Sequence, residues 1–141
     1  MDTSSVPRSA FDKTGSMLYF ARMLDKIRLH ARGELQHDFQ DNLGKGADHW
    51  CTSFLHVDYE ELKQRVLAGG TDDEILEWCQ AQGRGLNEVD LLVWNQFMTK
   101  LGWNDFASAR LEAVKAGSGL ANRDDIQTMT QYFEVDEGRA P

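Results

Sequence analysis

The chain has 141 residues, of which 23 are acidic and 15 are basic, and its formal net charge is −8. This length suits one domain with its own hydrophobic core, and the acidic balance argues against nonspecific binding to nucleic acid or to an anionic membrane. The sequence has no apolar run of membrane-spanning length, no signal-peptide pattern and two isolated cysteines, Cys51 and Cys79, so we expect a cytoplasmic protein with free thiols.

The N-terminal residues 1–15 are polar and rich in Ser and Thr, which predicts a flexible arm that ends at Gly15. Residues 16–141 form the predicted domain. The only prolines are Pro7 and Pro141, so the interior is free to be helical. No segment alternates polar and apolar residues for long enough to indicate a strand.

The segment Met17–Arg32 is predicted to be the first helix and the element around which the chain is organised. Its apolar residues fall on one broad face at helical spacing. The opposite face carries Arg22, Asp25 and Lys26 among further apolar residues, so both sides are expected to contact protein. Arg22 and Lys26 are like charges one turn apart, which is mildly unfavourable unless Asp25 or a bound anion compensates. We interpret these three residues as either a satisfied network of ion pairs or a ligand site.

The segment 34–46 is the longest irregular connection, and long ordered loops are often functional. It contains Gly44-Lys45-Gly46 before a predicted helix, but it lacks the strand and the Ser or Thr of a P-loop, and Asp48 stands where an anion would bind. Capping residues and glycines predict six helices after the first. They cover Ala47–Leu55, the segment from a cap at Asp58 to Gly69, the segment from Thr71 to Gly83, Asn87–Leu101, Asp105–Ala116 after a cap at Asn104, and Arg123–Phe133 after a cap at Asn122.

The predicted helix 87–101 is apolar over much of its circumference and is expected to be the most buried one. Trp94 lies within its apolar arc, and Asn95 lies at the margin of that arc, where an amide is expected to bind a helix end or a ligand. The stretch Asp136-Glu137-Gly138-Arg139 after the last predicted helix is interpreted as an acidic tail that folds back and pairs with basic residues. Together these elements predict an all-α fold, a single compact bundle of about six to seven short helices.

No metal site and no nucleophile are expected. His49 and His56 are two helical turns apart, and the only other His-acid combination is His37-Asp38, so the spacing does not suit a transition metal. Cys51 does not face His49 on a helix, so no Cys–His pair follows. We predict no metal and no cofactor.

Several segments of the chain resemble one known family. They are ARMLDKIR (21–28), LGKGADHWCTSFL (43–55), TDDEILEWC (71–79), VWNQFMTKLGWND (93–105) and RDDIQTMTQYFEVDEGR (123–139). They are similar, in the same order, to a family of small bacterial proteins catalogued only as a domain of unknown function. The resemblance implies one complete, bacterial and soluble domain, and it carries no established activity and no catalytic residues.

The leading functional hypothesis is a non-catalytic intracellular binding module. It would recognise a small anionic ligand or a protein partner through the face that carries Arg22, Asp25 and Lys26. The first alternative is an enzyme whose charged cluster polarises a substrate in a pocket lined by Trp94 and Asn95. The second alternative is a homodimer that buries the charged face. A deep pocket with converging polar groups distinguishes an enzyme from a flat interaction surface.

Overall fold

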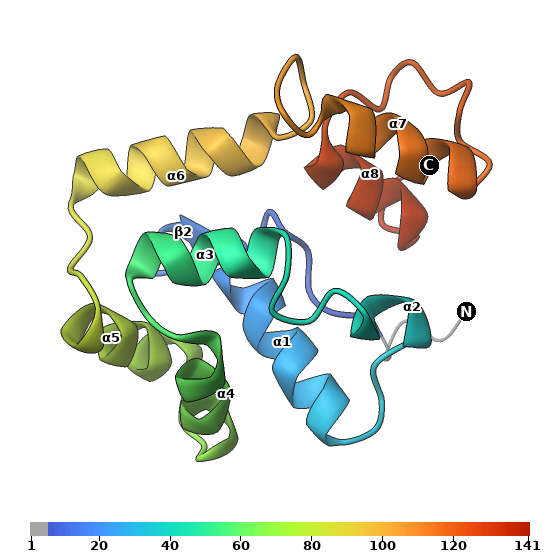
Figure 1. The fold of residues 1–141 in the computed structure, drawn as a ribbon. Helices are drawn as coiled ribbons and strands as arrows, with labels where there is room; N and C mark the ends of the chain where they lie inside the picture. Colours follow the sequence, from blue (N-terminus) through green and yellow to red (C-terminus); the bar gives the residue numbers. More distant parts are fainter. Residues whose placement is uncertain (1–5) are drawn as a thin grey trace.

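The computed structural model describes residues 6–141, and this range contains eight helices and one two-stranded hairpin (Figure 1). The elements in chain order are β1 (Lys13–Thr14), β2 (Met17–Leu18), α1 (Phe20–Ala31), α2 (His37–Gln40), α3 (Ala47–Leu55), α4 (Tyr59–Leu67), α5 (Asp72–Gln82), α6 (Glu88–Lys100), α7 (Ser108–Gly117) and α8 (Met129–Asp136). The mostly helical fold is confirmed, but the helix count is eight and not six to seven. The additional helix is α2, a single turn too short to produce a hydrophobic period.

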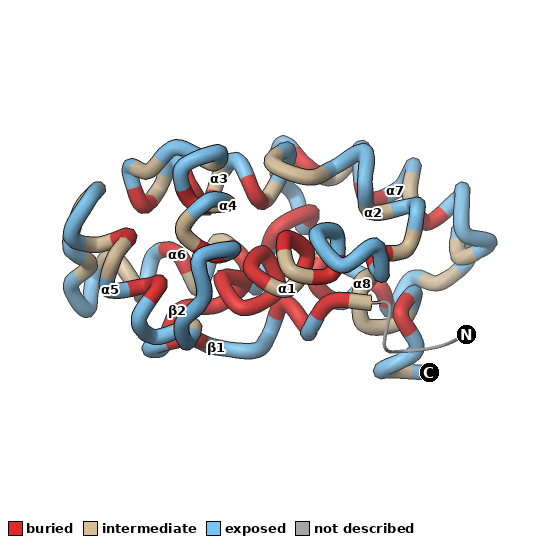
Figure 2. Tube along the Cα trace, turned by 90° about the horizontal axis from the view of Figure 1, so that it is seen from below, coloured by how far each residue is buried: buried red, intermediate tan, exposed pale blue. Residues whose placement is uncertain are grey.

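The centre of the molecule is α1, which Figure 2 shows as an almost continuously buried segment between the other elements. Its residues Phe20, Met23 and Leu24 are fully buried. The helix packs against α4 and against β1, and α6 covers β2. The helices α4 and α6 therefore pack on α1 and on the hairpin that precedes it, respectively.

The prediction that 87–101 forms the most buried helix is wrong. In α6, Val89 is 65% exposed and Leu92 is 60% exposed, whereas Trp94 and Met98 are buried. Figure 1 shows the reason, because α6 runs from α5 to α7 along one side of the molecule. Such a helix has neighbours on one face only, whatever the composition of its other face.

The predicted first helix begins later than expected because its first residues form a β-hairpin. Met17 and Leu18 pair antiparallel with Thr14 and Lys13. The two residues of the turn, Gly15 and Ser16, have φ angles of 51° and 71°. Positive φ at both positions is the type I′ arrangement that suits the twist of a short hairpin. The apolar pattern of Met17 and Leu18 fits a helical face equally well, so periodicity alone did not reveal the hairpin.

The first residues of the predicted flexible arm, 1–5, lie outside the described part of the chain. The rest of that segment packs on the body, since Pro7 and Ala10 are buried. The Tyr19 backbone N–H donates to the Ala10 carbonyl at 3.1 Å, and Arg8 pairs with Asp25 at 2.9 Å. The hairpin and α1 therefore hold the residues just after position 5 in place.

Three predicted helix starts are confirmed by their caps. The side chains of Asp58, Thr71 and Asn87 each accept the backbone N–H three residues further on, and Thr71 and Asn87 form complete capping boxes. The last two helices begin later than predicted: α7 starts at Ser108 instead of Asp105, and α8 starts at Met129 instead of Arg123.

The late starts of α7 and α8 have local causes. Asn104 adopts a φ of 50°, and the Asp105 carboxylate accepts the N–H groups of Gly102 and Ala107, so this stretch is a side-chain-stabilised turn. Thr128 caps α8 in a capping box with Gln131. Thr128 is therefore the N-cap of α8, in place of Asn122, which the sequence predicted.

Both cysteines are free and buried. Burial raises the pKa of the Cys79 thiol to about 12 and also raises the pKa of Cys51. Neither is therefore a reactive thiolate at neutral pH. Among the residues that the structure describes, no helix is long and apolar enough to cross a membrane.

Candidate ligand-binding site

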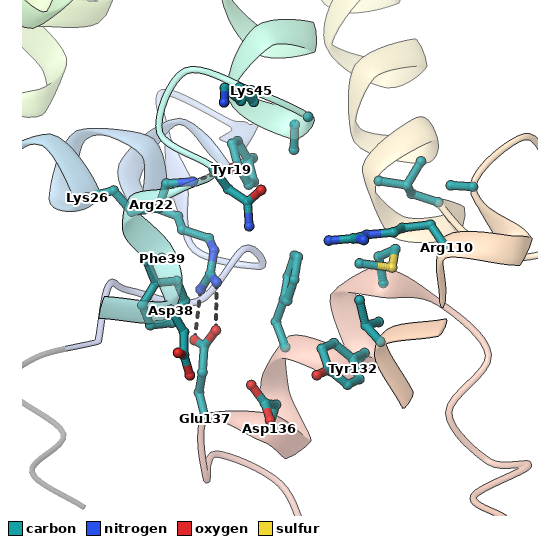
Figure 3. Close-up of a pocket in the computed structure, with 18 of the residues that line it drawn as sticks. Tyr19, Arg22, Lys26, Asp38, Phe39, Lys45, Arg110, Tyr132, Asp136 and Glu137 are labelled. Carbon is teal, nitrogen blue, oxygen red and sulfur yellow. Dashed lines mark hydrogen bonds and ion pairs between the residues drawn. The ribbon is translucent and has the colours of Figure 1, made fainter. Parts of the chain in front are cut away.

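A cavity of about 450 Å³ lies where α1, the α2–α3 segment, α7 and α8 meet (Figure 3). It joins parts of the chain that are far apart in sequence. The charged and aromatic residues that line it are Tyr19, Arg22, Lys26, Asp38, Phe39, Lys45, Trp50, Arg110, Tyr132, Phe133, Asp136 and Glu137. The size falls within the range of small-molecule sites.

One wall of the cavity is fixed by a buried ion pair between α1 and the C-terminal segment. The Arg22 guanidinium donates to both carboxylate oxygens of Glu137, at 2.8 and 2.6 Å, and both side chains are at most 3% exposed. Arg139 adds a second cation to Glu137 at 2.6 Å, and the Arg22 guanidinium lies 4.5 Å from the centre of the Phe133 ring. Burial by itself lowers the pKa of Arg22, but the hydrogen bonds and charge of Glu137 outweigh it and raise that pKa. Arg22 therefore stays charged and engaged.

A second buried cluster joins α1 to the start of α3. The Lys26 ammonium lies 2.9 Å from Oδ1 of Asp48 and donates to the Tyr19 hydroxyl at 3.3 Å. Tyr19 donates its own proton to Asp48 at 2.6 Å, and the Gly44 N–H donates to the other carboxylate oxygen. Asp48 is fully buried and Lys26 is 5% exposed. The third N–H of Lys26 has no acceptor among residues 6–141, and Lys26 lines the cavity.

These groups have shifted pKa values for identifiable reasons. Burial lowers the pKa of Lys26, and the charge of Asp48 opposes that shift. Burial and Asp48 raise the pKa of the Tyr19 hydroxyl well above its usual range. Tyr19 is therefore a protonated hydrogen-bond donor at neutral pH.

Tyr19 has an unusual backbone conformation at the point where the hairpin meets α1. Its φ is 75° and its ψ is −30°, which a residue with a side chain rarely adopts. Such a conformation costs about 1–3 kcal/mol and persists only where the surroundings hold it. Here the surroundings are the Ala10 carbonyl, which binds the Tyr19 N–H, and Asp48, which binds its hydroxyl.

Two further cations reach the cavity without a partner. Lys45 lies in the turn between Gly44 and Gly46, whose φ angles are 75° and 58°, and Arg110 extends from α7 towards the centre of the cavity (Figure 3). Neither side chain forms an ion pair or hydrogen bond within the described residues. The glycine-flanked turn is not a phosphate cradle, because its Gly44 N–H already donates a hydrogen bond to the Asp48 carboxylate. The sequence had placed Asp48 where an anion would bind.

The opposite side of the cavity is acidic. Asp38 of α2 and Asp136 of α8 lie beside Glu137 in Figure 3, and neither forms an ion pair within residues 6–141. Burial, Glu137 and Asp38 together raise the pKa of Asp136. The carboxylates on this side, Asp38, Asp136 and Glu137, therefore outnumber the two cations, Arg22 and Arg139, that pair with Glu137.

The structure separates the five residues selected from the sequence. Arg22 and Lys26 line the cavity, but Asp25 lies away from it and pairs with Arg8 at 2.9 Å. Trp94 donates from its indole to the Leu18 carbonyl, and the Asn95 side chain bonds the backbone of Ser16 and Leu18.

Trp94 and Asn95 thus hold the hairpin and are not part of the cavity lining. The enzyme alternative required one pocket that is lined by Arg22 and Lys26 together with Trp94 and Asn95. In the structure, Trp94 and Asn95 do not line the cavity that contains Arg22 and Lys26. The amide at the margin of the apolar arc does bind something specific, as expected, but its partner is a hairpin backbone.

Sequence reasoning missed most of the other polar residues of the site. Asp48 was considered only as a block to anion binding, and Lys45 only as part of a turn. Glu137 belongs to the acidic tail that was expected to fold back onto basic residues, and its contact with Arg22 agrees with that expectation. For Tyr19 and Arg110, neither spacing nor composition carried a signal.

No curated protein matches this chain in sequence. A family model described as a domain of unknown function, DUF5069, matches residues 4–139. The matched range includes every residue that lines the cavity. The chain therefore belongs to the DUF5069 family.

Proposed function

We propose that this protein is a non-catalytic binding module that takes a small organic anion into the cavity between α1, α3, α7 and α8. The observation that carries the proposal is the third N–H of Lys26, which has no acceptor among residues 6–141 and belongs to a side chain that is 7% exposed and lines a cavity of about 450 Å³. Buried polar hydrogens usually have partners. An anionic oxygen of a ligand would complete this one.

Lys45 and Arg110 support the same proposal. Both line the cavity and lack a partner within residues 6–141, so each has charge available for a ligand. Charge-assisted hydrogen bonds to a carboxylate or phosphate are stronger than neutral ones. The apolar part of a ligand would pack against Trp50, Phe133 and Met129, which line the cavity as well.

The state of the buried groups supports binding over catalysis. The Tyr19 proton is donated to Asp48, Lys26 is paired with Asp48, and Arg22 is held by Glu137. A general base needs a pKa near the working pH and a free lone pair. The arrangement supplies fixed donors instead.

The remaining parts of the proposal concern location and assembly. Two free, buried thiols suit a reducing compartment, which supports a cytoplasmic location. The charged face of α1 is covered by Asp48 and Glu137 of the same chain, so a second copy is not needed to satisfy it.

The test is a thermal unfolding screen with phosphate, sulfate, linear mono- and dicarboxylates and sugar phosphates. A ligand that binds only the folded state raises the unfolding midpoint in proportion to ln(1 + [L]/Kd). We expect at least one of these anions to raise the midpoint of the wild type, and this effect to be lost in the double variant Lys45→Gln/Arg110→Gln.

The matched control is Lys100→Gln, since Lys100 is exposed on α6 and lies outside the cavity. It should respond to anions as the wild type does. The proposal fails if no anion raises the midpoint, or if Lys45→Gln/Arg110→Gln and Lys100→Gln respond equally.

A further inference from the structure

We propose that the ligand of this cavity is a zwitterion, a small molecule with a carboxylate or phosphate at one end and a protonated amine at the other. Its anionic end lies at Lys26, Lys45 and Arg110, and its amine lies between Asp38 and Asp136. This inference rests on the proposed function and names the class of ligand for the same site.

Apart from Arg22, which is paired with Glu137 on the lower side, the cavity separates its charges into two sides. In Figure 3, Lys45 and Lys26 lie above the cavity and Arg110 enters from the α7 side, whereas Asp38 and Asp136 lie below it. A surface with randomly mixed charges would present no such polarity. The two sides instead match the two ends of a molecule that carries both signs.

The balance of charge in the lining favours a zwitterion over a simple anion. Two buried ion pairs, Arg22 with Glu137 and Lys26 with Asp48, balance the charges of these four groups, although one N–H of Lys26 still lacks an acceptor among residues 6–141. The charged lining residues that then remain are two cations and two carboxylates: Lys45, Arg110, Asp38 and Asp136. A simple anion would gain attraction from one side and repulsion from the other, whereas a zwitterion gains attraction from both.

The acidic side has the composition of an ammonium site. Phe39, whose ring centre lies 5.7 Å from the Arg22 guanidinium, is next to Asp38, and Tyr132 is next to Asp136 (Figure 3). Carboxylates together with aromatic rings are a favourable environment for organic cations. Burial, together with the charges of Glu137 and Asp38, raises the pKa of Asp136, and a ligand ammonium beside this carboxylate would oppose that shift.

The buried cation Lys26 provides the independent observation at the other side. Its ammonium is held by Asp48 and Tyr19, its side chain is 7% exposed and lines the cavity, and its remaining N–H has no acceptor among residues 6–141. Exposed carboxylates alone would be an ordinary solvated surface. A fixed, buried donor opposite them makes the cavity a site with two defined ends.

The experiment compares three matched probes at each chain length from two to six carbons. They are the ω-amino carboxylate, the carboxylate without the amine, and the amine without the carboxylate, with the ω-amino phosphonates as a parallel series. Isothermal titration calorimetry at pH 7 measures each affinity. At the best length, we expect the amino acid or amino phosphonate to bind at least about tenfold tighter than either single-charge probe.

Substitutions then assign the two ends. In Asp38→Asn/Asp136→Asn the zwitterion should bind no tighter than the simple anion, and binding of the simple anion should be unchanged or improved. In Lys45→Gln/Arg110→Gln both should weaken. Asp12→Asn, an exposed carboxylate outside the cavity, is the control and should leave all affinities unchanged.

The outcomes separate this inference from the proposed function. If simple anions bind as tightly as zwitterions and the aspartate variants change nothing, the zwitterion is excluded while anion binding stands. If amines without an anionic group bind best, or if no probe binds, both proposals fail. All four substituted positions are exposed, so a folded variant is expected in each case.

Discussion

Two buried cations on α1 each lie against a buried carboxylate, but the two pairs differ in their support. Glu137 receives Arg22 and Arg139, so it has two cations. Asp48 has Lys26 as its only cation among the described residues, together with the neutral donors Tyr19 and Gly44. Loss of Lys26 therefore leaves Asp48 with a full charge in a fully buried position.

We predict that Lys26→Met lowers the free energy of unfolding by about 3 kcal/mol, because removing one partner of a buried pair leaves the other charge uncompensated. The double variant Lys26→Met/Asp48→Leu should recover part of that loss. Urea unfolding provides the measurement. The same substitution at the exposed Lys45 should change the stability by no more than about 0.5 kcal/mol. Equal losses for Lys26→Met and Lys45→Met would contradict the buried pair.

Asp136 gives a prediction with a pH dependence. Because its pKa is raised in the folded state, the folded protein holds this proton to higher pH than the unfolded chain does. Between the two pKa values unfolding releases the proton, so the contribution of Asp136 to stability falls as the pH rises through that window. Above the window its ionised carboxylate disfavours the folded state.

Asp136→Asn should therefore raise the thermal midpoint at pH 7, and its advantage over the wild type should shrink as the pH is lowered towards the ordinary range of a carboxyl group. Midpoints measured from pH 7 to pH 4 test this. Asp12→Asn serves as the control and should show no such trend. An advantage for Asp136→Asn that grows at low pH would show that the sign is wrong.

At the scale of the elements, backbone contacts fix how α3 and α5 meet. The Arg84 N–H donates to the Leu55 carbonyl at the end of α3, and Gly83 ends α5 directly beside that carbonyl. A Cβ at Gly83 would lie 1.9 Å from the Leu55 oxygen and 2.8 Å from the His56 oxygen. Both contacts are with backbone, so neither can move aside cheaply.

Gly83→Ala should consequently destabilise the protein by at least about 1–3 kcal/mol, the usual cost of overpacking a tight contact. Gly85→Ala is the matched control, because a Cβ at Gly85 meets nothing within 4 Å. Chemical denaturation of both variants provides the comparison. A Gly83→Ala variant as stable as Gly85→Ala would show that α3 and α5 are not held this closely.

At the scale of the whole molecule, the C-terminal segment closes the cavity. Glu137 binds Arg22 of α1, and Arg139 donates to the Pro7 carbonyl, so the end of the chain is tied to its beginning and to its central helix. Thr130 of α8 also donates to the Met98 carbonyl of α6 at 2.5 Å. The wall formed by α7 and α8 depends on these contacts, which bridge distant parts of the sequence.

Glu137→Gln should destabilise the protein by about 3 kcal/mol, since it leaves the buried Arg22 without its carboxylate. It should also increase amide hydrogen exchange in α8 more than in α4, because the end of α8 loses its ion pair with α1. Glu77→Gln, at an exposed position of α5, is the control. Uniform exchange changes in α4 and α8 would mean that Glu137 does not hold α8 specifically.

The sequence by itself determined the helical class and the starts of several helices. The caps at Asp58, Thr71 and Asn87 were readable because each uses a hydrogen bond to a backbone group three residues away. The sequence also identified Arg22 and Lys26 as charges that need compensation, since their spacing on a helix is a local property. It offered no signal for the positive φ of Tyr19.

Only the tertiary structure decided which partners those charges have and where the cavity lies. Arg22 and Glu137 are 115 positions apart, and Tyr19 and Asp48 are 29 apart, so no local pattern connects them. Likewise, the apolar composition of α6 does not indicate which of its faces has neighbours in the fold. Capping energies depend on a few adjacent residues, whereas burial and charge pairing depend on how all the helices pack, and the candidate site consists of the second kind of interaction.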